Sequence, residues 1–362
     1  KWKGLRDKET RYRQRYLDMI MNPGVKQVFY QRAEMLSFSR KFLIEKGFIE
    51  VETPILQPLY GGALAKPFVT HHNSLDMQLY LRIADELYLK RLIVGGMEKV
   101  FEVCKDFRNE GMDRMHNPEF SMIELYQAYA DYNDIMALVE LWLTGMSQEI
   151  IGSLKIDYQG TEIDLSLPWP RKGYCDLIEE HAGLKILEMS DAELREAAGQ
   201  IDSTGDFCRD NRGKLIDIIF SETVEPHLTG PVFVVDFPKE ISPLTKVHRN
   251  NYRLTERFEL YMFNQEVANA YSELNDPIEQ RRRFEEQVRW GESGDEETQP
   301  MDEDFLRALE YGMPPTGGLG VGFDRLVMIF TGQPSIRDVI LFPQLRPEEV
   351  AAPEEFDPED EE

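Results

Sequence analysis

The sequence predicts an α+β fold in which helices flank an antiparallel β-sheet, and three observations predict it. Segments 99–110 and 119–130 alternate apolar and polar residues on either side of a polar loop, as two paired strands do. Segment 256–275 contains a second pair of this kind. Apolar residues in 25–46 and 135–142 instead recur at helical spacing. Helices mixed with hairpin-like strand pairs indicate this fold class.

The first quarter of the chain carries clear start and stop signals. Glycine commonly ends a helix, and proline ends a strand because it lacks a backbone donor. The expected elements are a helix over 25–46 capped by Gly47, a strand over 48–53 stopped by Pro54, a flexible loop at Gly61 and Gly62, and a helix over 85–94.

The first strand pair gathers polar and aromatic side chains. Alternation places charged groups on one face of 99–110, where Glu102, Cys104, Asp106, Arg108 and Glu110 share a parity. In the second strand a common face holds Phe120, Met122, Glu124, Tyr126 and Ala128. An amphipathic helix follows, for which Asn133 or Asp134 is the expected N-cap.

The second half has one loosely patterned region and one sharply defined one. Residues 152–238 mix helical segments and predict an inserted, mainly helical subdomain. The pair in 256–275 is expected to turn near Asn264. A glycine-rich strand over 317–323 then precedes a helix that Asp324 opens.

Charge is concentrated rather than spread. The chain has 362 residues and a formal net charge of −25, yet segments 292–304 and 347–362 hold acids and no base. A tail of this composition is expected to be disordered. The negative net charge also argues against a protein that coats nucleic acids without sequence specificity. There is no run of 18 apolar residues, which predicts no transmembrane helix. The chain begins with Lys, so we expect a piece of a soluble protein.

Three cysteines, Cys104, Cys175 and Cys208, lie far apart in the sequence. This spacing argues against a disulfide scaffold or a zinc ribbon and fits a reducing cytoplasm. His71 and His72 are adjacent, so on a strand they would face opposite ways, and we interpret them as structural.

Two groups of residues could bind a nucleotide. Arg108, Glu110, His116 and Phe120 could hold a phosphate and stack on a base, or could form a surface ion pair beside a core aromatic. The glycines of 317–322 do not have dinucleotide-binding spacing, and no phosphate-binding loop is present. They could let a ligand approach the strand under Arg325, or could simply pack.

Carboxylates gather around the second strand pair, at Glu256, Glu259, Glu266 and Glu273. Converging carboxylates would suit Mg²⁺, whereas a solvated acidic face is the plainer interpretation. Strict alternation puts Glu266 on the opposite parity from Glu259 and Glu273. A turn or bulge is therefore required if all of them converge.

Taken together, three segments resemble the catalytic domain of the class II aminoacyl-tRNA synthetases, and most closely the lysyl-tRNA synthetase family. GFIEVETPIL at 47–56 resembles motif 1, with its characteristic proline at Pro54. FRNEGMDRMHNPEFSMIELYQAYADY at 107–132 resembles motif 2, and GGLGVGFDRLVM at 317–328 resembles motif 3. Three motifs in order over nearly the whole chain form a specific signal.

The resemblance implies roles in ATP and metal binding. Arg108 would hold the α-phosphate, and Phe120 and Arg325 would sandwich the adenine. Glu110, His116 and Asn117 would lie along the nucleotide. Glu259 and Glu266 would bind Mg²⁺, and Arg108 and Arg325 would be the catalytic residues.

The resemblance also implies a lysine pocket made of Gly62, Glu86, Glu124, Tyr126, Asn269, Tyr271 and Glu273. A buried ammonium needs carboxylate partners, and these residues supply acids without a base. ATP, L-lysine and tRNA(Lys) are the expected partners. A homodimer is also expected, because motif 1 lies at the subunit interface in this family and Phe29, Leu36, Phe38 and Leu43 exceed one amphipathic stripe.

Residues 1–22 resemble the linker that follows an N-terminal anticodon-binding barrel, so the barrel is expected to be missing from this chain. Residues 23–346 would then form the catalytic domain, and 347–362 the acidic tail. One alternative is a stand-alone paralogue that ligates lysine to a protein, as the elongation factor P lysine ligases do. The other is a non-catalytic, synthetase-like regulatory protein, which typically loses motif residues.

Overall fold

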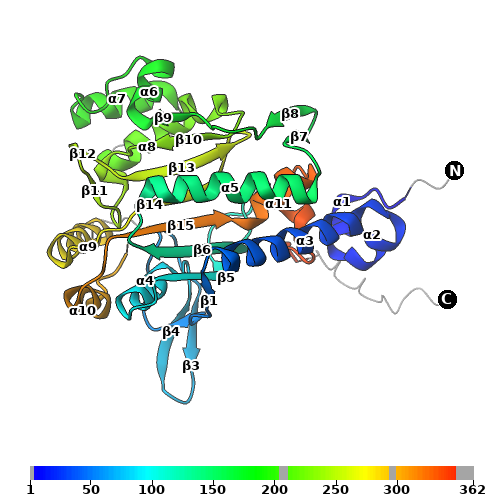
Figure 1. The fold of residues 1–362 in the computed structure, drawn as a ribbon, viewed down its shortest axis with the longest axis horizontal. Coiled ribbons are helices and arrows are strands. Elements are labelled where there is room, and N and C mark those ends of the chain that lie inside the picture. The colour runs from blue at the N-terminus through cyan, green and yellow to red at the C-terminus, as the bar shows by residue number, and fades with distance from the viewer. Residues whose placement is uncertain (1–3, 204–210, 293–298, 348–362) are drawn as a thin grey trace, which may run out of the picture.

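The computed structural model describes residues 4–203, 211–292 and 299–347, and it confirms the α+β architecture (Figure 1). A large sheet has the strand order β1-β5-β6-β15-β14-β13-β10-β9. Its strands are β1 (Ile49–Glu50), β5 (Lys99–Phe107), β6 (Glu119–Ala128), β9 (Arg171–Gly173), β10 (Val232–Val235), β13 (Arg257–Met262), β14 (Gln265–Ser272) and β15 (Thr316–Gly322). Neighbours pair antiparallel in the middle, while β1 runs parallel to β5 and β9 parallel to β10.

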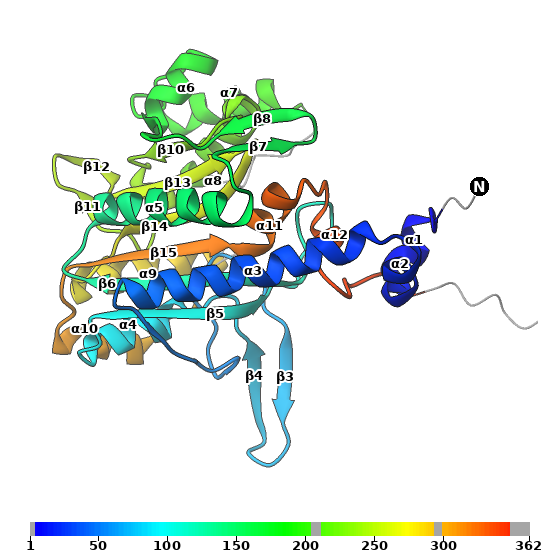
Figure 2. The same cartoon turned by 45° about the vertical axis from the view of Figure 1, so that its right-hand side comes forward.

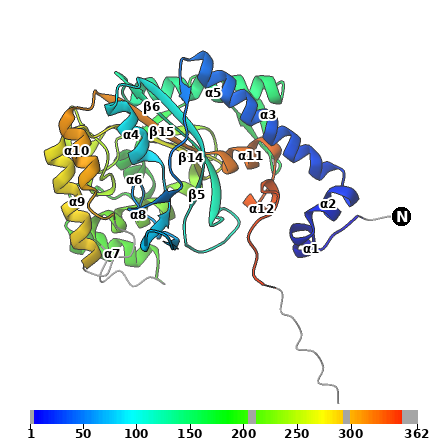
Figure 3. The same ribbon diagram turned by 90° about the horizontal axis from the view of Figure 1, so that it is seen from below.

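One face of the sheet is buried under α3 (Gly24–Glu45), α5 (Tyr132–Ile150) and α11 (Phe323–Thr331). Figure 3 shows α3 and α5 side by side on this face. Alternate strand residues point into that core, among them Ile123 and Leu125 of β6 and Leu319 and Val321 of β15. Because strand side chains alternate, the residues between them point to the opposite face.

The opposite face is only partly covered. Helices α4 (Glu86–Val94), α9 (Pro277–Glu292) and α10 (Glu303–Tyr311) pack together at one end of the sheet, on the left in Figure 1. Their apolar residues form a separate cluster with Val100 and Tyr126. The middle of this face is therefore free to carry a site.

Segment 152–238 divides between two environments. Helices α6 (Tyr174–Ala182), α7 (Asp191–Ile201) and α8 (Arg212–Thr223), with the 3-10 turn η1 (Glu225–His227), have a hydrophobic cluster of their own. Strands β7 (Lys155–Tyr158) and β8 (Thr161–Asp164) form a hairpin. Strands β9 and β10, from the same segment, instead extend the large sheet.

The remaining elements lie at the periphery. Figure 2 shows the β3–β4 hairpin projecting from the body. The elements are α1 (Lys8–Arg13), α2 (Arg15–Met21), β2 (Leu56–Gln57), β3 (Val69–His72), β4 (Met77–Leu81), η2 (Lys239–Ile241), β11 (Val247–His248), β12 (Asn251–Thr255) and α12 (Ile336–Val339). Buried Arg15 ties α2 to the C-terminal segment by donating to the carbonyls of Arg337, Ile340 and Leu341 at 2.7–3.2 Å. Among the described residues, no helix combines the length and apolarity needed to cross a membrane.

Two local predictions are wrong. The expected strand over 48–53 shortens to Ile49–Glu50, because Thr53 leaves the sheet edge and donates its backbone N–H to the Glu102 carboxylate at 3.0 Å. The N-cap of α5 is Asp131, which is extended and accepts from the backbone N–H of Asn133 at 2.9 Å. The side chain of Asp134 accepts a hydrogen bond from the backbone N–H of Asp131, which completes a capping box.

The expected acidic tail lies outside the described residues apart from Pro347, and Cys208 also lies outside them. His71 and His72 lie on β3, where His71 Nε2 is 3.2 Å from the Asp76 carboxylate.

Candidate active site

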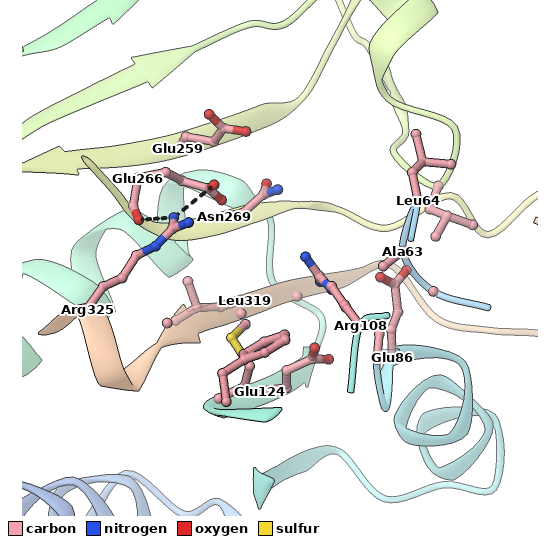
Figure 4. Close-up of a pocket in the computed structure, with 18 of the residues that line it drawn as sticks. Ala63, Leu64, Glu86, Arg108, Glu124, Glu259, Glu266, Asn269, Leu319 and Arg325 are labelled. Atoms are coloured by element: carbon pink, nitrogen blue, oxygen red, sulfur yellow. Dashed lines mark hydrogen bonds and ion pairs between the residues drawn. The ribbon is translucent and has the colours of Figure 1, made fainter. Parts of the chain in front are cut away.

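A cavity of about 380 Å³ opens on the sheet face that points away from α3 and α5. Residues from the β4–α4 connection, the motif 2 loop, β6, β13, β14, β15 and the start of α11 meet there (Figure 4). Every residue that the resemblance assigned to ATP, Mg²⁺ or lysine lines it: Gly62, Glu86, Arg108, Glu110, His116, Asn117, Phe120, Glu124, Tyr126, Glu259, Glu266, Asn269, Tyr271, Glu273 and Arg325. This volume suits a small-molecule ligand.

Arg108 presents an uncommitted guanidinium in the middle of the cavity. It lies just beyond the end of β5, where its backbone N–H donates to the Pro118 carbonyl at 2.9 Å and closes the motif 2 loop. Its guanidinium carbon is 5.1 Å from the centroid of the Phe120 ring. Within the described part of the chain, Nε of Arg108 has no hydrogen-bond partner. A buried donor left open in this way is available to an anionic ligand.

Arg325 stands at the other end of the cavity, held by hydrogen bonds to two residues. Its Nη1 donates to the Glu266 carbonyl at 2.8 Å, and its Nη2 donates to Nε2 of His116 at 3.1 Å. His116 is oriented in turn by Asp113, whose carboxylate lies 2.9 Å from Nδ1. The guanidinium is therefore fixed beside the glycine strand, as Figure 4 shows.

Glu110 and Asn117 lie at the rim of the same loop. Glu110 accepts a long bond of 3.3 Å from the backbone N–H of Lys66. Asn117 donates to the Glu119 carbonyl at 2.6 Å, which leaves its Oδ1 without a partner in the described structure.

The β-bulge that is required to bring Glu266 to the same side of the sheet as Glu259 is present. Leu260 pairs with Ala268 and Tyr261 pairs with Glu266, so Val267 is an extra residue in β14. Val267 enters the hydrophobic core, and Glu266 turns to the cavity side with Glu259 and Asn269. Glu256 does not join them, because it pairs with Arg249 at 2.6 Å away from the cavity.

Glu259 and Glu266 lie on one wall of the cavity, each beside an arginine. Burial raises the pKa of Glu259 to about 8, although Arg257 beside it favours the ionised form. Tyr261 donates to its other oxygen at 2.7 Å. Glu266 is more exposed and lies 3.6 Å from Arg325. Two carboxylates on one wall, one of them destabilised as an anion, form a donor set that a hard divalent cation would suit.

The other end of the cavity holds three glutamates and two tyrosines. Tyr271 donates to Glu86 at 2.7 Å, and Tyr126 donates to Glu124 at 3.2 Å. Gly318 leaves room for the Glu273 carboxylate because it has no side chain. A Cβ at this position would lie 2.0 Å from Oε1 of Glu273.

The prediction that this end contains no base is wrong. Lys90 of α4 is fully buried, and its ammonium contacts the carboxylates of both Glu86 and Glu273. Burial by itself lowers the pKa of Lys90, but Glu273 and Glu86 raise it above its ordinary value. One ammonium faces two carboxyl groups, and burial raises the pKa of Glu273 to about 8, so the pocket holds acid groups that a second cation would stabilise as anions. The signal was available, because Glu86 and Lys90 are four residues apart on the predicted helix.

Residues beyond the predicted set close the cavity. Arg257 donates to the Ile241 carbonyl at 2.7 Å and to the Asn269 side chain at 3.1 Å, which anchors the loop after β10 over the site. Gln299 lies 3.4 Å from the backbone N–H of Gly62. The long separation of these partners in the sequence left no local signal for them.

Comparison with known proteins agrees with this geometry. The family model of class II tRNA synthetases (D, K and N) matches residues 7–346. A lysine--tRNA ligase of Pelotomaculum thermopropionicum is 56% identical over 353 residues, which cover 96% of this chain and 69% of that protein. Lysine--tRNA ligases of Moorella thermoacetica and Porphyromonas gingivalis are 54% and 53% identical, each over 96% of this chain and over 71% and 60% of their own lengths. The chain therefore belongs to the class II tRNA synthetases of the D, K and N group.

Proposed function

We propose that the chain activates L-lysine with ATP and transfers the lysyl group to the 3′ end of tRNA(Lys). The observation that carries this proposal is the convergence of the Glu86, Glu124 and Glu273 carboxyl groups in one cavity with Arg108, whose Nε has no hydrogen-bond partner among the described residues. The relatives named lysine--tRNA ligase support the same assignment.

Substrate choice follows from the charge of the pocket. Lysine brings two ammonium groups, and the carboxylates exceed the single ammonium that Lys90 supplies. A ligand with a carboxylate side chain would instead add a further buried negative charge, which is costly without a basic partner. We assign Gly62, Glu86, Glu124, Tyr126, Asn269, Tyr271 and Glu273 to lysine.

In the activation step, a lysine carboxylate oxygen attacks the α-phosphorus of ATP. The bond from that phosphorus to the bridging oxygen breaks, and pyrophosphate leaves with the electron pair. Arg108, in the middle of the cavity, would bind the α-phosphate and the charge that develops on it, and Phe120 and Arg325 would hold the adenine between them. His116, Glu110 and Asn117 position the nucleotide. The step depends on alignment and charge neutralisation, so no protein base is required.

We assign Mg²⁺ to Glu259 and Glu266, because they offer carboxylate oxygens on one cavity wall and a cation would stabilise the ionised form of buried Glu259. When bound, Mg²⁺ would neutralise phosphate charge and orient the leaving pyrophosphate. In the second step a ribose hydroxyl of the tRNA 3′ end would attack the activated carbonyl, and AMP would leave. Translation of this kind would place the protein in the cytoplasm.

A homodimer formed through motif 1 is part of the proposal. The four residues on which that expectation rested do not supply its surface: Leu43 is buried, Leu36 and Phe38 pack against the core, and Phe29 stacks on Arg15. Other apolar side chains of α3, β1 and the following segment are exposed, namely Tyr30, Ile44, Ile49, Ile55 and Leu56. An exposed apolar group of this size favours a partner subunit.

The product of the first step tests the proposal. The chain would be incubated with ATP, Mg²⁺, pyrophosphatase and an equimolar mixture of lysine, aspartate and asparagine, and the aminoacyl-adenylate would be identified by mass. We expect lysyl-adenylate. Aspartyl- or asparaginyl-adenylate as the main product would refute the lysine assignment.

A further inference from the structure

Three side chains that can bind a metal lie together beside the cavity, and the proposed activity uses none of them. Cys104 and Asp106 are two residues apart on β5, so their side chains face the same side of the sheet. Asp85 is the residue before α4. One donor atom of each, a thiol sulfur and two carboxylate oxygens, lies within 4.8 Å of the other two. None of the three residues lines the cavity.

The protein encloses all three side chains. Their exposed fractions are 0% for Asp85, 3% for Cys104 and 1% for Asp106. Carboxylates often gather on a solvated acidic face, but burial excludes that explanation here. Polar groups as buried as these are expected to have bonding partners.

Asp85 lacks such a partner. It occupies the N-cap position of α4, yet its side chain does not cap the helix. Among the described residues, neither of its carboxylate oxygens has a hydrogen-bond partner. The carboxylate is directed at the Cys104 sulfur and the Asp106 carboxylate, since a donor atom of each lies within 4.8 Å. A fully buried carboxylate with two open oxygens points to a bound cation.

Asp106 is oriented as a metal ligand commonly is. Its Oδ2 lies 3.9 Å from the Cys104 sulfur, and its Oδ1 lies 3.3 Å from Nε of Arg82. Arg82 is itself buried and is fixed by Glu102 at 2.7 Å. A guanidinium thus holds one oxygen while the other faces the thiol, and outer residues typically orient a ligating carboxylate in this manner.

The distance from the Cys104 sulfur to Asp106 Oδ2 is close to the distance across a zinc ion. Zinc–sulfur and zinc–oxygen bonds of about 2.3 and 2.1 Å at a tetrahedral angle place the two donors about 3.6 Å apart. Asp85 can rotate to complete the group, because no hydrogen bond from a described residue holds its oxygens. The Met122 carbonyl, 3.6 Å from the same sulfur, could accept the thiol proton instead, but that contact leaves Asp85 without a partner.

The charge of the group also favours a cation. Burial raises the pKa of Asp85 to about 6 and the pKa of Asp106 to about 7. Burial likewise raises the pKa of the Cys104 thiol well above its ordinary value. Arg82 contacts the group but is shared with Glu102. A divalent ion would stabilise the thiolate and both carboxylates as anions.

A thiolate and two carboxylates select the ion. Mg²⁺ and Ca²⁺ take oxygen donors, whereas Zn²⁺ is bound by cysteine sulfur and aspartate oxygen in tetrahedral sites. We propose that Asp85, Cys104 and Asp106 bind one structural Zn²⁺, with the second open oxygen of Asp85 as the fourth donor. The site needs a single cysteine, so the wide cysteine spacing that argues against a zinc ribbon does not exclude it.

The ion would join the start of α4 to β5. Glu86 follows Asp85 and lines the cavity, so a bound Zn²⁺ would brace that wall without touching a substrate. The site is distinct from the Mg²⁺ site assigned to Glu259 and Glu266, whose donors are oxygens alone. Zinc binding here does not depend on which amino acid the cavity accepts.

The metal content of the chain tests the site. The chain would be produced with added Zn²⁺, freed of loosely bound ions by gel filtration, and analysed by mass spectrometry of the elements. We expect about one zinc ion per chain in the parent, and loss of that ion in Cys104→Ala and in Asp85→Ala. Cys175→Ala is the matched control, because it removes the other free cysteine of the described chain and should keep the ion.

A cobalt-substituted parent provides a second measurement that needs no variant to fold. Co²⁺ takes the same donors, and we expect the sulfur-to-cobalt charge-transfer absorption that a thiolate ligand produces. A parent without stoichiometric zinc, zinc undiminished in Cys104→Ala, or a cobalt form without the thiolate band would each overturn the zinc site. Zinc lost in Glu259→Gln and kept in Cys104→Ala would assign the ion to the other acidic site and overturn it as well. These measurements use neither lysine nor ATP, so any of these results leaves the proposed function standing.

Discussion

Gly318→Ala is expected to damage lysine binding through a steric contact that the structure defines. A Cβ at this position would lie 2.0 Å from Oε1 of Glu273 and 2.6 Å from Cε1 of Tyr126. Neither neighbour can swing away freely, since Glu273 is buried against Lys90 and Tyr126 is buried against Glu124. The added methyl group must therefore displace the Glu273 carboxylate from its place in the pocket.

The size of the effect follows from two costs. Overpacking a buried site costs about 1–3 kcal/mol of stability. Misplacing a buried carboxylate that faces a ligand ammonium costs about 2–5 kcal/mol of binding. The lower figure corresponds to a dissociation constant raised about 30-fold, measurable by calorimetric titration below the melting temperature. ATP affinity should change little, because the nucleotide residues lie at the other end of the cavity.

Gly317→Ala is the matched control. The neighbouring glycine points to the opposite face, where a Cβ would lie 2.7 Å from Cγ1 of Ile135. This variant should lose stability and keep the lysine affinity of the parent. Parent-like lysine binding by Gly318→Ala, or an equal loss of binding in both variants, would refute the placement of Glu273 in the pocket.

Three further predictions follow from the same geometry. Arg108→Ala should lower lysine-dependent ATP–pyrophosphate exchange by about 100-fold or more, as expected for loss of a charge-stabilising donor, and parent-like exchange would remove Arg108 from the catalytic residues. Glu273→Gln is nearly isosteric and should weaken lysine binding about 30-fold or more with little change in ATP affinity; a lower melting temperature with intact lysine binding would instead indicate a structural role beside Lys90. Sedimentation should show a dimer at micromolar concentration, and Ile49→Asp should dissociate that dimer. Ile278→Asp, which changes an exposed apolar residue of α9, should leave the dimer intact. A stable monomeric parent would contradict the motif 1 interface.

The alternation of residues along the strands predicted those parts of the site that lie on regular secondary structure. Alternation in β6 placed Glu124 and Tyr126 on one face, and the parity of Glu266 required the bulge that Val267 provides. Both conclusions depend only on the period of a strand, which nearby residues set.

Contacts between distant segments could not be predicted in that way. The helix after β6 begins at Tyr132, and the extended residue before it, Asp131, is the N-cap; Asn133 and Asp134 offered equally suitable capping residues in the sequence. Arg257 and the loop it anchors meet the site only through the folded sheet. Lys90 of α4 is buried against Glu273, which follows β14 and lies far from α4 in the sequence.

The central claim is that this cavity activates lysine, and amino-acid-dependent ATP–pyrophosphate exchange tests it most directly. The rate would be measured with lysine, aspartate and asparagine added separately, with Mg²⁺ and without tRNA. We expect exchange with lysine that exceeds exchange with either other amino acid by orders of magnitude, and that falls in Glu273→Gln at subsaturating lysine. Exchange driven by aspartate or asparagine and not by lysine would contradict the claim.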